Sequence, residues 1–304
     1  MELPKDEFEK VSKKEKESEA IVRPNISYWQ DVWRRLKLNK LAMAGLIFVI
    51  FITLLAIFGP ILSKYNYYSQ DLNMANLPPS AAHWFGTDKF GRDIFVRILY
   101  GARISLTVGY AASLLNIIIG IIYGGVAGYF GGKVDNIMMR IVDILYSIPM
   151  TIYVILFMVV FGAGLKSIII ALAVAFWLTM ARIVRGEIMS LKQQEFVLAA
   201  KTLGASSTRI IFKHLIPNCM GPIIVTLTLS VPDAIFTESF LSFIGLGVSA
   251  PMASWGTLAS DALDGFQLYP LQLFFPSMAI CLTMLAFNLL GDGLRDSLDP
   301  KMKK

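Results

Sequence analysis

Two carboxylates inside one apolar run are the residues of this chain best placed to do chemistry. Asp233 follows Pro232 directly, and Glu238 lies five residues further on. An acidic side chain in an apolar span is unfavourable unless it faces a partner or a water-filled cavity. A five-residue step turns a helix well past one full turn, so the two carboxylates point to different faces. Each carboxylate can either line a solute pathway or be paired in a structural role, and both interpretations stay open. Because the two point to different faces, we expect at least one of the carboxylates to be structural.

Sequence patterns for other chemistry are absent. The phosphate-binding pattern G-x-x-x-x-G-K-[ST] does not occur, because Gly132-Lys133 lacks both the earlier glycine and a following Ser or Thr. HExxH and GxSxG are also absent, and the two histidines, His83 and His214, fall in different predicted loops. The two cysteines form no CxxC pattern. The sequence therefore predicts no enzyme, no metal site and no cofactor in this chain.

A polar, basic segment between two apolar runs, residues 195–218, is a candidate contact surface for a partner. Residues 195–203 are good helix formers, and Gly204 stands where a helix that ends in the left-handed conformation needs it. Ser206 or Ser207 can then cap a second helix. The segment predicts a helix, a tight turn and a second helix; the alternative is an ordinary solvated loop.

The elements that position these residues are apolar helices. Hydrophobic residues make up 55% of the 304 residues and charged residues 16%, against roughly one quarter charged in soluble domains. A helix needs about 20 apolar residues to cross a bilayer. Apolar runs occur at residues 41–62, 104–130, 137–161, 168–184, 217–244 and 271–290. The sequence predicts an all-α membrane protein with six transmembrane helices.

Two segments precede the first span. Residues 1–26 are rich in Lys and Glu, which predicts a disordered cytoplasmic tail and not a signal peptide. Trp29, Val32, Trp33 and Leu36 then recur at helical spacing opposite charged residues. This pattern is typical of an amphipathic helix at the membrane surface, an interfacial elbow helix; the alternative is the cytoplasmic start of the first span.

Charges outside the spans predict the orientation. An even number of spans puts both termini on one side, and Lys and Arg are concentrated in the termini and the central loop. Because positive residues favour the cytoplasm, both termini and residues 186–216 are predicted to be cytoplasmic. Residues 247–270 contain no Lys or Arg, as an outside loop should, whereas the predicted outside loop 64–101 contains several. We keep the assignment because the other loops agree and loop 64–101 is long.

These predictions divide the chain into four parts. We expect a disordered cytoplasmic tail (1–26), an elbow helix with the first span and an outside loop (27–102), a core of five spans with the cytoplasmic loop 186–216 (103–292), and a cytoplasmic C-terminal tail (293–304). In the core, Gly120, Gly124, Gly128 and Gly132 recur every four residues. Small residues at that spacing let another helix pack closely, so we expect a structural role for them.

The polar segment also carries an ordered motif. Its spacing is that of a known loop: Ala199-Ala200 is followed by Gly204 after three residues and by Pro217 after twelve more. They resemble the cytoplasmic loop of permease subunits of ATP-binding-cassette importers, where the motif reads Glu-Ala-Ala, three residues, Gly, nine residues, Ile, one residue, Leu-Pro. The resemblance implies that the first short helix is a coupling helix that docks into a groove on an ATPase subunit.

Two positions depart from that motif. Leu198 stands where the family has Glu, and His214 stands where it has the first Ile. Glu195 lies one helical turn before Leu198, and residues three apart share a face, so Glu195 can supply the missing carboxylate. The coupling residues implied by the resemblance are therefore Glu195, Ala199, Ala200 and Gly204.

Further stretches are similar to the oligopeptide and dipeptide permease branch of that family, in particular its C-type subunit. They are GTDKFGRD (86–93), GYFGGKVDNIMMRIVDILYSIP (128–149), ESFLSFIGLG (238–247), SWGTLASDAL (254–263) and FNLLGDGLRDSLDPK (287–301). Their agreement in order along the chain is stronger than the loop motif alone.

Five residues in two of these stretches fall in predicted outside loops. They are Thr87, Asp88, Arg92, Asp93 and Trp255. From the topology, we expect them on the extracytoplasmic face, near a binding protein or an outer gate.

The resemblance implies a six-span type I importer permease fold that works by alternating access in the plasma membrane of a prokaryote. Its implied partners are a second permease subunit, two ATPase subunits that bind ATP and Mg²⁺, an extracytoplasmic peptide-binding protein, the peptide and membrane lipid; no nucleic acid is expected. The same architecture could import nickel or another small solute. An alternative from another class is a channel or an ion-gradient-driven transporter, but the repeated halves frequent in the latter are not seen.

Overall fold

The computed structural model describes residues 27–162 and 164–299. The predicted tail 1–26 and the C-terminal lysines lie outside this part. Within it the chain is helical, with no β-strand beyond one isolated bridge. The elements are α2 (Tyr28–Leu38), α3 (Lys40–Leu62), η2 (Leu72–Met74), α4 (Ile94–Phe130), α5 (Gly132–Tyr146), α6 (Met150–Phe161), α7 (Leu165–Leu191), α8 (Glu195–Thr202), α9 (Ser207–Arg209), η3 (Ile210–Leu215), α10 (Ile216–Asn218), α11 (Met220–Phe243), α12 (Trp255–Ala262), η4 (Leu263–Gly265) and α13 (Pro270–Leu298).

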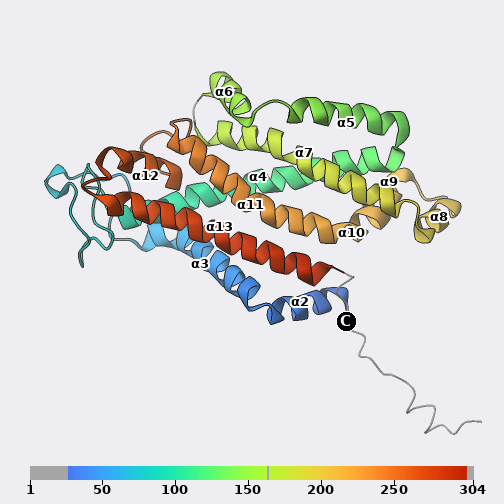
Figure 1. The fold of residues 1–304 in the computed structure, drawn as a ribbon, viewed down its shortest axis with the longest axis horizontal. Helices are drawn as coiled ribbons and strands as arrows, with labels where there is room; N and C mark the ends of the chain where they lie inside the picture. The colour runs from blue at the N-terminus through green and yellow to red at the C-terminus, as the bar shows by residue number, and fades with distance from the viewer. Residues whose placement is uncertain (1–26, 163, 300–304) are drawn as a thin grey trace, which may run out of the picture.

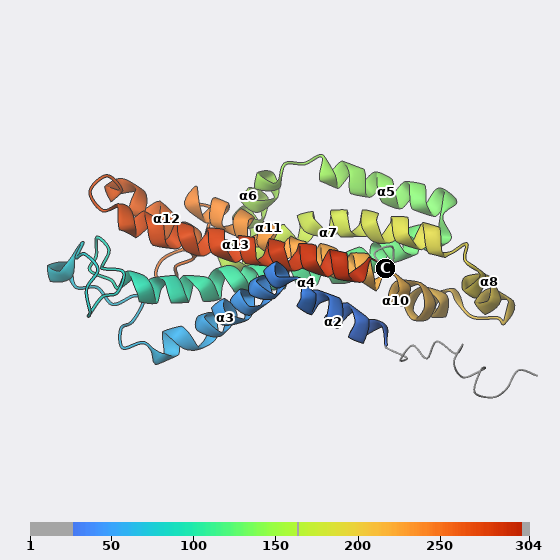
Figure 2. The ribbon, with the colours of Figure 1, turned by 60° about the horizontal axis from the view of Figure 1, so that its bottom comes forward.

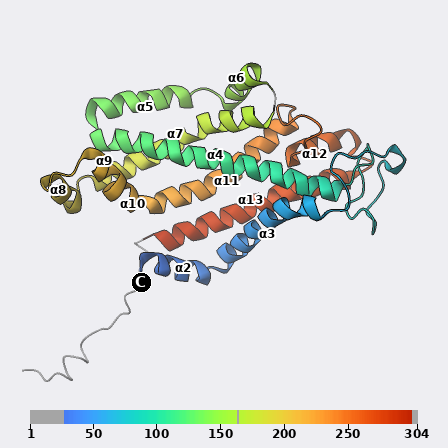
Figure 3. The ribbon, with the colours of Figure 1, turned by 180° about the vertical axis from the view of Figure 1, so that it is seen from behind.

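The helices form an elongated bundle. α4, α7, α11 and α13 run along its long axis (Figure 1). α5 and α6 lie along one edge, and α2 and α3 lie along the opposite edge (Figure 2). α8 protrudes at one end, whereas α12 and the loop before α4 form the other end, as the view from behind also shows (Figure 3). The two candidate contact regions of the sequence are thus at opposite ends of the molecule.

Five helices of the described part are long and apolar enough to cross a membrane: α3, α4, α7, α11 and α13. The third predicted span, residues 137–161, is instead a bent pair, because α5 and α6 meet at 84°. Counted as one broken span, this pair brings the total to the predicted six. Pro149 at the bend lacks a backbone N–H and disfavours helix at the residue before it, which accounts for the break.

Several helices run past the ends of the predicted spans. α4 begins at Ile94, so the predicted boundary at 102/103 falls inside it, and α7 continues to Leu191, which shortens the predicted loop 186–216. α13 continues to Leu298, so residues 293–298 are helix and not the predicted tail. Hydropathy reports where a helix leaves the apolar layer, whereas backbone hydrogen bonds decide where it ends.

The α4–α7 contact forms much of the core, and three of the four predicted glycines explain it. A Cβ atom at Gly120 or Gly124 would overlap Met180 or Ala181 of α7, and one at Gly128 would lie 2.8 Å from a backbone carbonyl. The backbones therefore touch, as the glycine spacing predicted. Gly132 differs, because it begins α5 and has no such neighbour.

The predicted amphipathic helix at the N-terminus is α2. Val32 and Leu36 are buried, while Trp29 and Trp33 are exposed. α2 packs on α13, and the Tyr28 hydroxyl lies 3.5 Å from the backbone carbonyl of the last residue of α13. The first and last described elements are therefore neighbours.

Candidate functional site

At the protruding end the chain makes a helix and a tight turn, as predicted. α8 ends at Thr202, and Gly204 follows with a φ of +77°. The amide of Gly204 donates to the Lys201 carbonyl at 2.9 Å, and the amide of Ala205 donates to the Ala200 carbonyl at 3.0 Å. These are the two bonds of a Schellman turn, in which glycine takes the left-handed position.

A second helical stretch follows the turn. The hydroxyl of Ser206 accepts a hydrogen bond from the Arg209 amide at 3.3 Å, so the first of the two candidate serines is the cap. The stretch then passes through α9, the π-helical η3 and α10. Ile210 and Leu215 are buried with Val197 of α8 in one apolar cluster. This cluster fixes α8 and the turn relative to the rest of the bundle.

The structure separates the predicted coupling residues. Ala200 is only 9% exposed and packs in the chain's own apolar cluster, whereas Glu195, Ala199 and Gly204 are exposed. The sequence motif shows that two small residues are adjacent but not which one faces outward. Only Ala199 of the pair is therefore on the outer surface of α8.

Two large apolar side chains that the sequence analysis did not assign to the contact surface are exposed at the same end. Leu203 is 88% exposed and Leu198 is 52% exposed. Leu203 lines a recess of about 450 Å³ together with Phe196, Arg209 and His214. Apolar residues in an otherwise polar turn were the available sequence signal. The turn thus offers an apolar tip with a positively charged margin.

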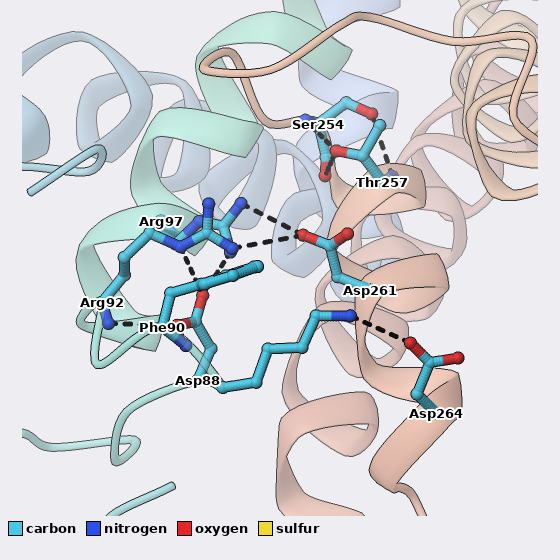
Figure 4. Close-up of polar contacts among 9 residues, drawn as sticks. Asp88, Phe90, Arg92, Arg97, Ser254, Thr257, Asp261 and Asp264 are labelled. Atoms are coloured by element: carbon cyan, nitrogen blue, oxygen red, sulfur yellow. Dashed lines mark hydrogen bonds and ion pairs between the residues drawn. The ribbon is translucent and has the colours of Figure 1, made fainter. Parts of the chain in front are cut away.

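At the opposite end, an ion-pair cluster joins the loop before α4 to α12 (Figure 4). Asp88 accepts hydrogen bonds from Arg92 Nε at 2.7 Å and from Arg97 Nη1 at 2.5 Å. Both guanidinium groups also reach Asp261 Oδ2 of α12, at 3.4 and 3.3 Å. Two arginines therefore share two carboxylates, and the local charge is balanced within the chain.

Thr87 and Asp93 fix the shape of the same loop. They form the antiparallel bridge, and Asp93 caps α4 by accepting from the Val96 amide at 2.8 Å. The second carboxylate oxygen of Asp93 lies 2.8 Å from His83 Nδ1. The Thr87 hydroxyl accepts from the Leu77 amide at 2.8 Å. The polar side chains predicted for this outer loop are buried and hold the loop together.

Glu238 and Trp255 join three helices in the interior. Glu238 is fully buried and accepts hydrogen bonds from the hydroxyls of Ser105 at 2.8 Å and Ser242 at 2.7 Å. Trp255 is also fully buried, and its indole N–H donates to the Ile98 carbonyl at 3.1 Å. These bonds connect α4, α11 and α12, which favours the structural interpretation of Glu238. Trp255, which was expected in an extracytoplasmic loop, is the first residue of α12, and its ring packs in the core.

Asp233 has different surroundings. It lies in the wall of a cavity of about 660 Å³ bordered by α4, α7, α11 and the bend between α5 and α6. α11 continues through Pro232 without a break. Treating residues 137–161 as one continuous span hid this cavity, and Pro149 was the signal that could have revealed it. The structure therefore places Asp233, and not Glu238, beside an open internal space.

Two protein-family models match the chain. The model described as "Binding-protein-dependent transport system inner membrane component" matches residues 116–304. The model described as "N-terminal TM domain of oligopeptide transport permease C" matches residues 27–79. Together they include both the protruding turn and the N-terminal helices.

Curated relatives match along nearly the whole chain. OppC of Bacillus subtilis (strain 168), an oligopeptide transport system permease protein, is 54% identical over 302 residues, which cover 99% of each chain. DppC of the same organism, a dipeptide transport system permease protein, is 55% identical over 99% of this chain and 95% of that protein. OppC of Haemophilus influenzae is 47% identical over 90% of this chain and 89% of that protein.

Solved structures show the same fold. Inward-facing structures of the MetNI methionine ABC transporter align with TM-scores of 0.57 and 0.56. The alignments cover 68% of this chain and 96% and 98% of the transporter chains, at 17% and 18% identity. At that identity, the likeness concerns the arrangement of the helices.

Proposed function

This chain belongs to the family of binding-protein-dependent transport system inner membrane components, and from that membership we propose that it forms half of the membrane pathway of an ATP-driven peptide importer. Its relatives at 54% and 55% identity are named for oligopeptide and dipeptide transport, which supports a peptide as the substrate. The peptide crosses by alternating access, while the chemistry of ATP hydrolysis belongs to other subunits.

The proposed assembly needs three kinds of partner protein. A second permease subunit completes the pathway, two ATPase subunits bind ATP and Mg²⁺, and an extracytoplasmic binding protein delivers the peptide. ATP binding can drive the cycle only if the ATPases hold the permease pair more tightly in one access state than in the other. That difference must be transmitted through a contact surface on this chain.

In the proposed orientation, the α8 end faces the cytoplasm. Lys201, Arg209 and Lys213 lie in this region, and positive residues favour the cytoplasmic side. α2 and the end of α13, which are neighbours, lie in the same half of the bundle (Figure 1). The ion-pair cluster and α12 then face outward, toward the binding protein.

The observation that carries the proposal is the apolar tip of the α8 turn. Leu203 is 88% exposed, immediately before the left-handed Gly204, and the apolar cluster beneath the turn holds it in position. An exposed leucine fixed by a rigid turn is suited to enter a recess on another protein. We therefore assign Leu203 to the ATPase contact together with Glu195, Ala199 and Gly204.

Leu203→Asp tests this contact. The charge should weaken docking of the ATPase subunits and abolish binding-protein-stimulated ATP hydrolysis and peptide uptake in reconstituted vesicles. Leu203 packs on little of its own chain, so the variant should still insert and co-purify with the second permease. Loss of an interface anchor typically costs about 2 kcal/mol, which is roughly a thirtyfold loss of affinity.

The matched control is Leu203→Met, which keeps an apolar side chain of similar volume and should retain coupling. Wild-type uptake by Leu203→Asp would contradict the proposed contact. Uptake driven by an ion gradient without ATP would contradict the proposed importer.

A further inference from the structure

A groove lies between the last turns of α3 and the first turns of α4. It has a volume of about 390 Å³, and its helical walls are Leu55, Gly59 and Leu62 of α3 and Phe95, Val96 and Leu99 of α4. Leu55 and Leu62 are seven residues apart, so at 1.5 Å per residue the groove follows α3 for about 10 Å. The helical part of the groove is apolar throughout.

The groove adjoins a surface that faces hydrocarbon. α3 is one of the spans, and the side chains that it exposes near the groove are Ile57, Phe58, Ile61 and Leu62. Leu62 is 81% exposed and also lines the groove. In a bilayer, apolar side chains of a span are in contact with acyl chains. An acyl chain can therefore pass from this surface into the groove without crossing a polar group.

One end of the groove is polar and positively charged. Ser63 and Lys64 follow the last residue of α3 and line this end. Lys64 is exposed and forms no ion pair within the described chain. The Ser63 hydroxyl accepts from the Tyr65 amide at 3.2 Å, which leaves its own proton available to a ligand. Two unused donors, one of them an ammonium group, thus lie side by side where the apolar span stops.

An aromatic side chain marks the same end as a membrane–water interface. Trp84 is 64% exposed, lines the groove, and has its ring 4.9 Å from that of Phe95. Tryptophan is enriched at the level of the lipid headgroups, because its ring is apolar and its N–H is polar. The charge of Lys64 is therefore placed at headgroup level, and the apolar walls extend from there toward the bilayer interior.

The other charged residue of the lining does not neutralise Lys64. Asp93 is buried, and its two carboxylate oxygens are engaged by the Val96 amide and by His83 Nδ1, both at 2.8 Å. A ligand that matches the groove needs an anionic group and an apolar chain attached to it. Inorganic phosphate would match Lys64 but would leave the apolar walls empty.

We propose that the groove binds an anionic phospholipid, with one acyl chain between α3 and α4 and the phosphate on Lys64 and Ser63. The volume lies within the range of about 300–1,000 Å³ that is usual for sites of small organic ligands. Phosphatidylcholine carries its own cation beside the phosphate, so Lys64 favours phosphatidylglycerol. The site does not depend on the solute that the complex carries or on which side of the membrane this end faces.

Trp84 is a built-in reporter for the lipid in this groove. The complex with the second permease is placed in vesicles of phosphatidylglycerol and phosphatidylcholine in equal amounts, and one lipid at a time carries brominated acyl chains, which quench nearby tryptophans. The difference in fluorescence between this complex and its Trp84→Phe variant isolates the signal of Trp84. Brominated phosphatidylglycerol should bind beside Trp84 about fivefold more strongly than brominated phosphatidylcholine, since one lysine near an anionic surface contributes about 1 kcal/mol.

Lys64 variants test the assigned contact. Lys64→Gln should bring the preference close to one, whereas Lys64→Arg keeps the positive charge and should retain it. Lys64 makes no ion pair with its own chain, so both variants should still co-purify with the second permease. Lys89→Gln is the matched control, because it removes an exposed lysine at the same end that does not line the groove; its preference should stay near fivefold.

Three results would overturn the site. Equal quenching by the two lipids in the wild-type complex would show that the groove does not select an anionic lipid. Loss of the preference in Lys89→Gln as well as in Lys64→Gln would assign it to the general surface charge. No quenching of Trp84 by either lipid would show that another subunit covers the groove.

Discussion

At the scale of single residues, Gly204 is required by its backbone conformation and not by the packing around it. A Cβ atom built at this position meets nothing within 4 Å, yet its φ of +77° is unfavourable for residues with a side chain. The effect of a substitution there is therefore a backbone effect. It acts on the position of Leu203 and not on the fold of the bundle.

Gly204→Ala should reduce coupled peptide uptake about fivefold, because roughly 1 kcal/mol of left-handed strain shifts the turn away from its docking shape. Gly204→Asn should retain more activity, since Asn tolerates the left-handed conformation better. Uptake and stimulated ATP hydrolysis are measured side by side, with thermal unfolding as a check. Equal activity of the Ala variant and wild type would show that the turn's shape does not matter.

Residue-scale predictions from the sequence were correct where the cause is local. The left-handed Gly204 and the Ser206 cap follow from nearest neighbours along the chain. The burial of Ala200 and Trp255 could not be predicted in this way, because the side of a helix that is buried depends on distant elements. Likewise, only the fold shows that Glu238 is buried with serine partners while Asp233 is exposed.

At the scale of elements, the α4–α7 contact is set by backbone proximity. Gly124→Ala puts a Cβ onto the Ala181 carbonyl and should destabilise the protein by about 1–3 kcal/mol, as overpacking typically does. The same substitution at Gly186 of α7 meets nothing within 4 Å and should be neutral or slightly stabilising. Thermal unfolding of both variants in detergent provides the comparison. A Gly124→Ala protein as stable as Gly186→Ala would mean that the two helices can separate freely.

Helices were predicted well by long apolar runs and poorly at their ends. The runs located α3, α4, α7, α11 and α13 because burial in lipid demands continuous apolar sequence. The bend between α5 and α6 was missed, since composition treats residues 137–161 as uniform. Pro149 interrupts the helix within this apolar run, because proline lacks the backbone N–H that a helix needs.

At the scale of the whole molecule, the proposed orientation predicts opposite accessibility of the two ends. In cells carrying Cys281→Ser, an impermeant thiol reagent should label Lys89→Cys from outside and Thr202→Cys only after lysis. Lys89 is beside the ion-pair cluster, and Thr202 is the last residue of α8. The reverse pattern would invert the topology.

Membrane class and family resemblance were evident from the sequence, since both depend on composition and ordered motifs. The bond between Ser105 and Glu238 was not, because the two residues lie 133 positions apart and meet only when α11 packs against α4. The pairing of Arg97 with Asp261 was hidden in the same way.

The length of α4 has a mechanical consequence. Its 37 residues make a rod of about 55 Å that runs from the ion-pair cluster toward the α8 end. Because its backbone touches that of α7, the two helices form a rigid pair and resist bending at the contact. A tilt of α4 by roughly 5° about one end moves its other end by about 5 Å, which is close to the pitch of one helical turn. If the α8 end faces the cytoplasm as proposed, a small tilt imposed there displaces the far end of α4, where Arg97 and its partner Asp261 of α12 lie, by several ångströms.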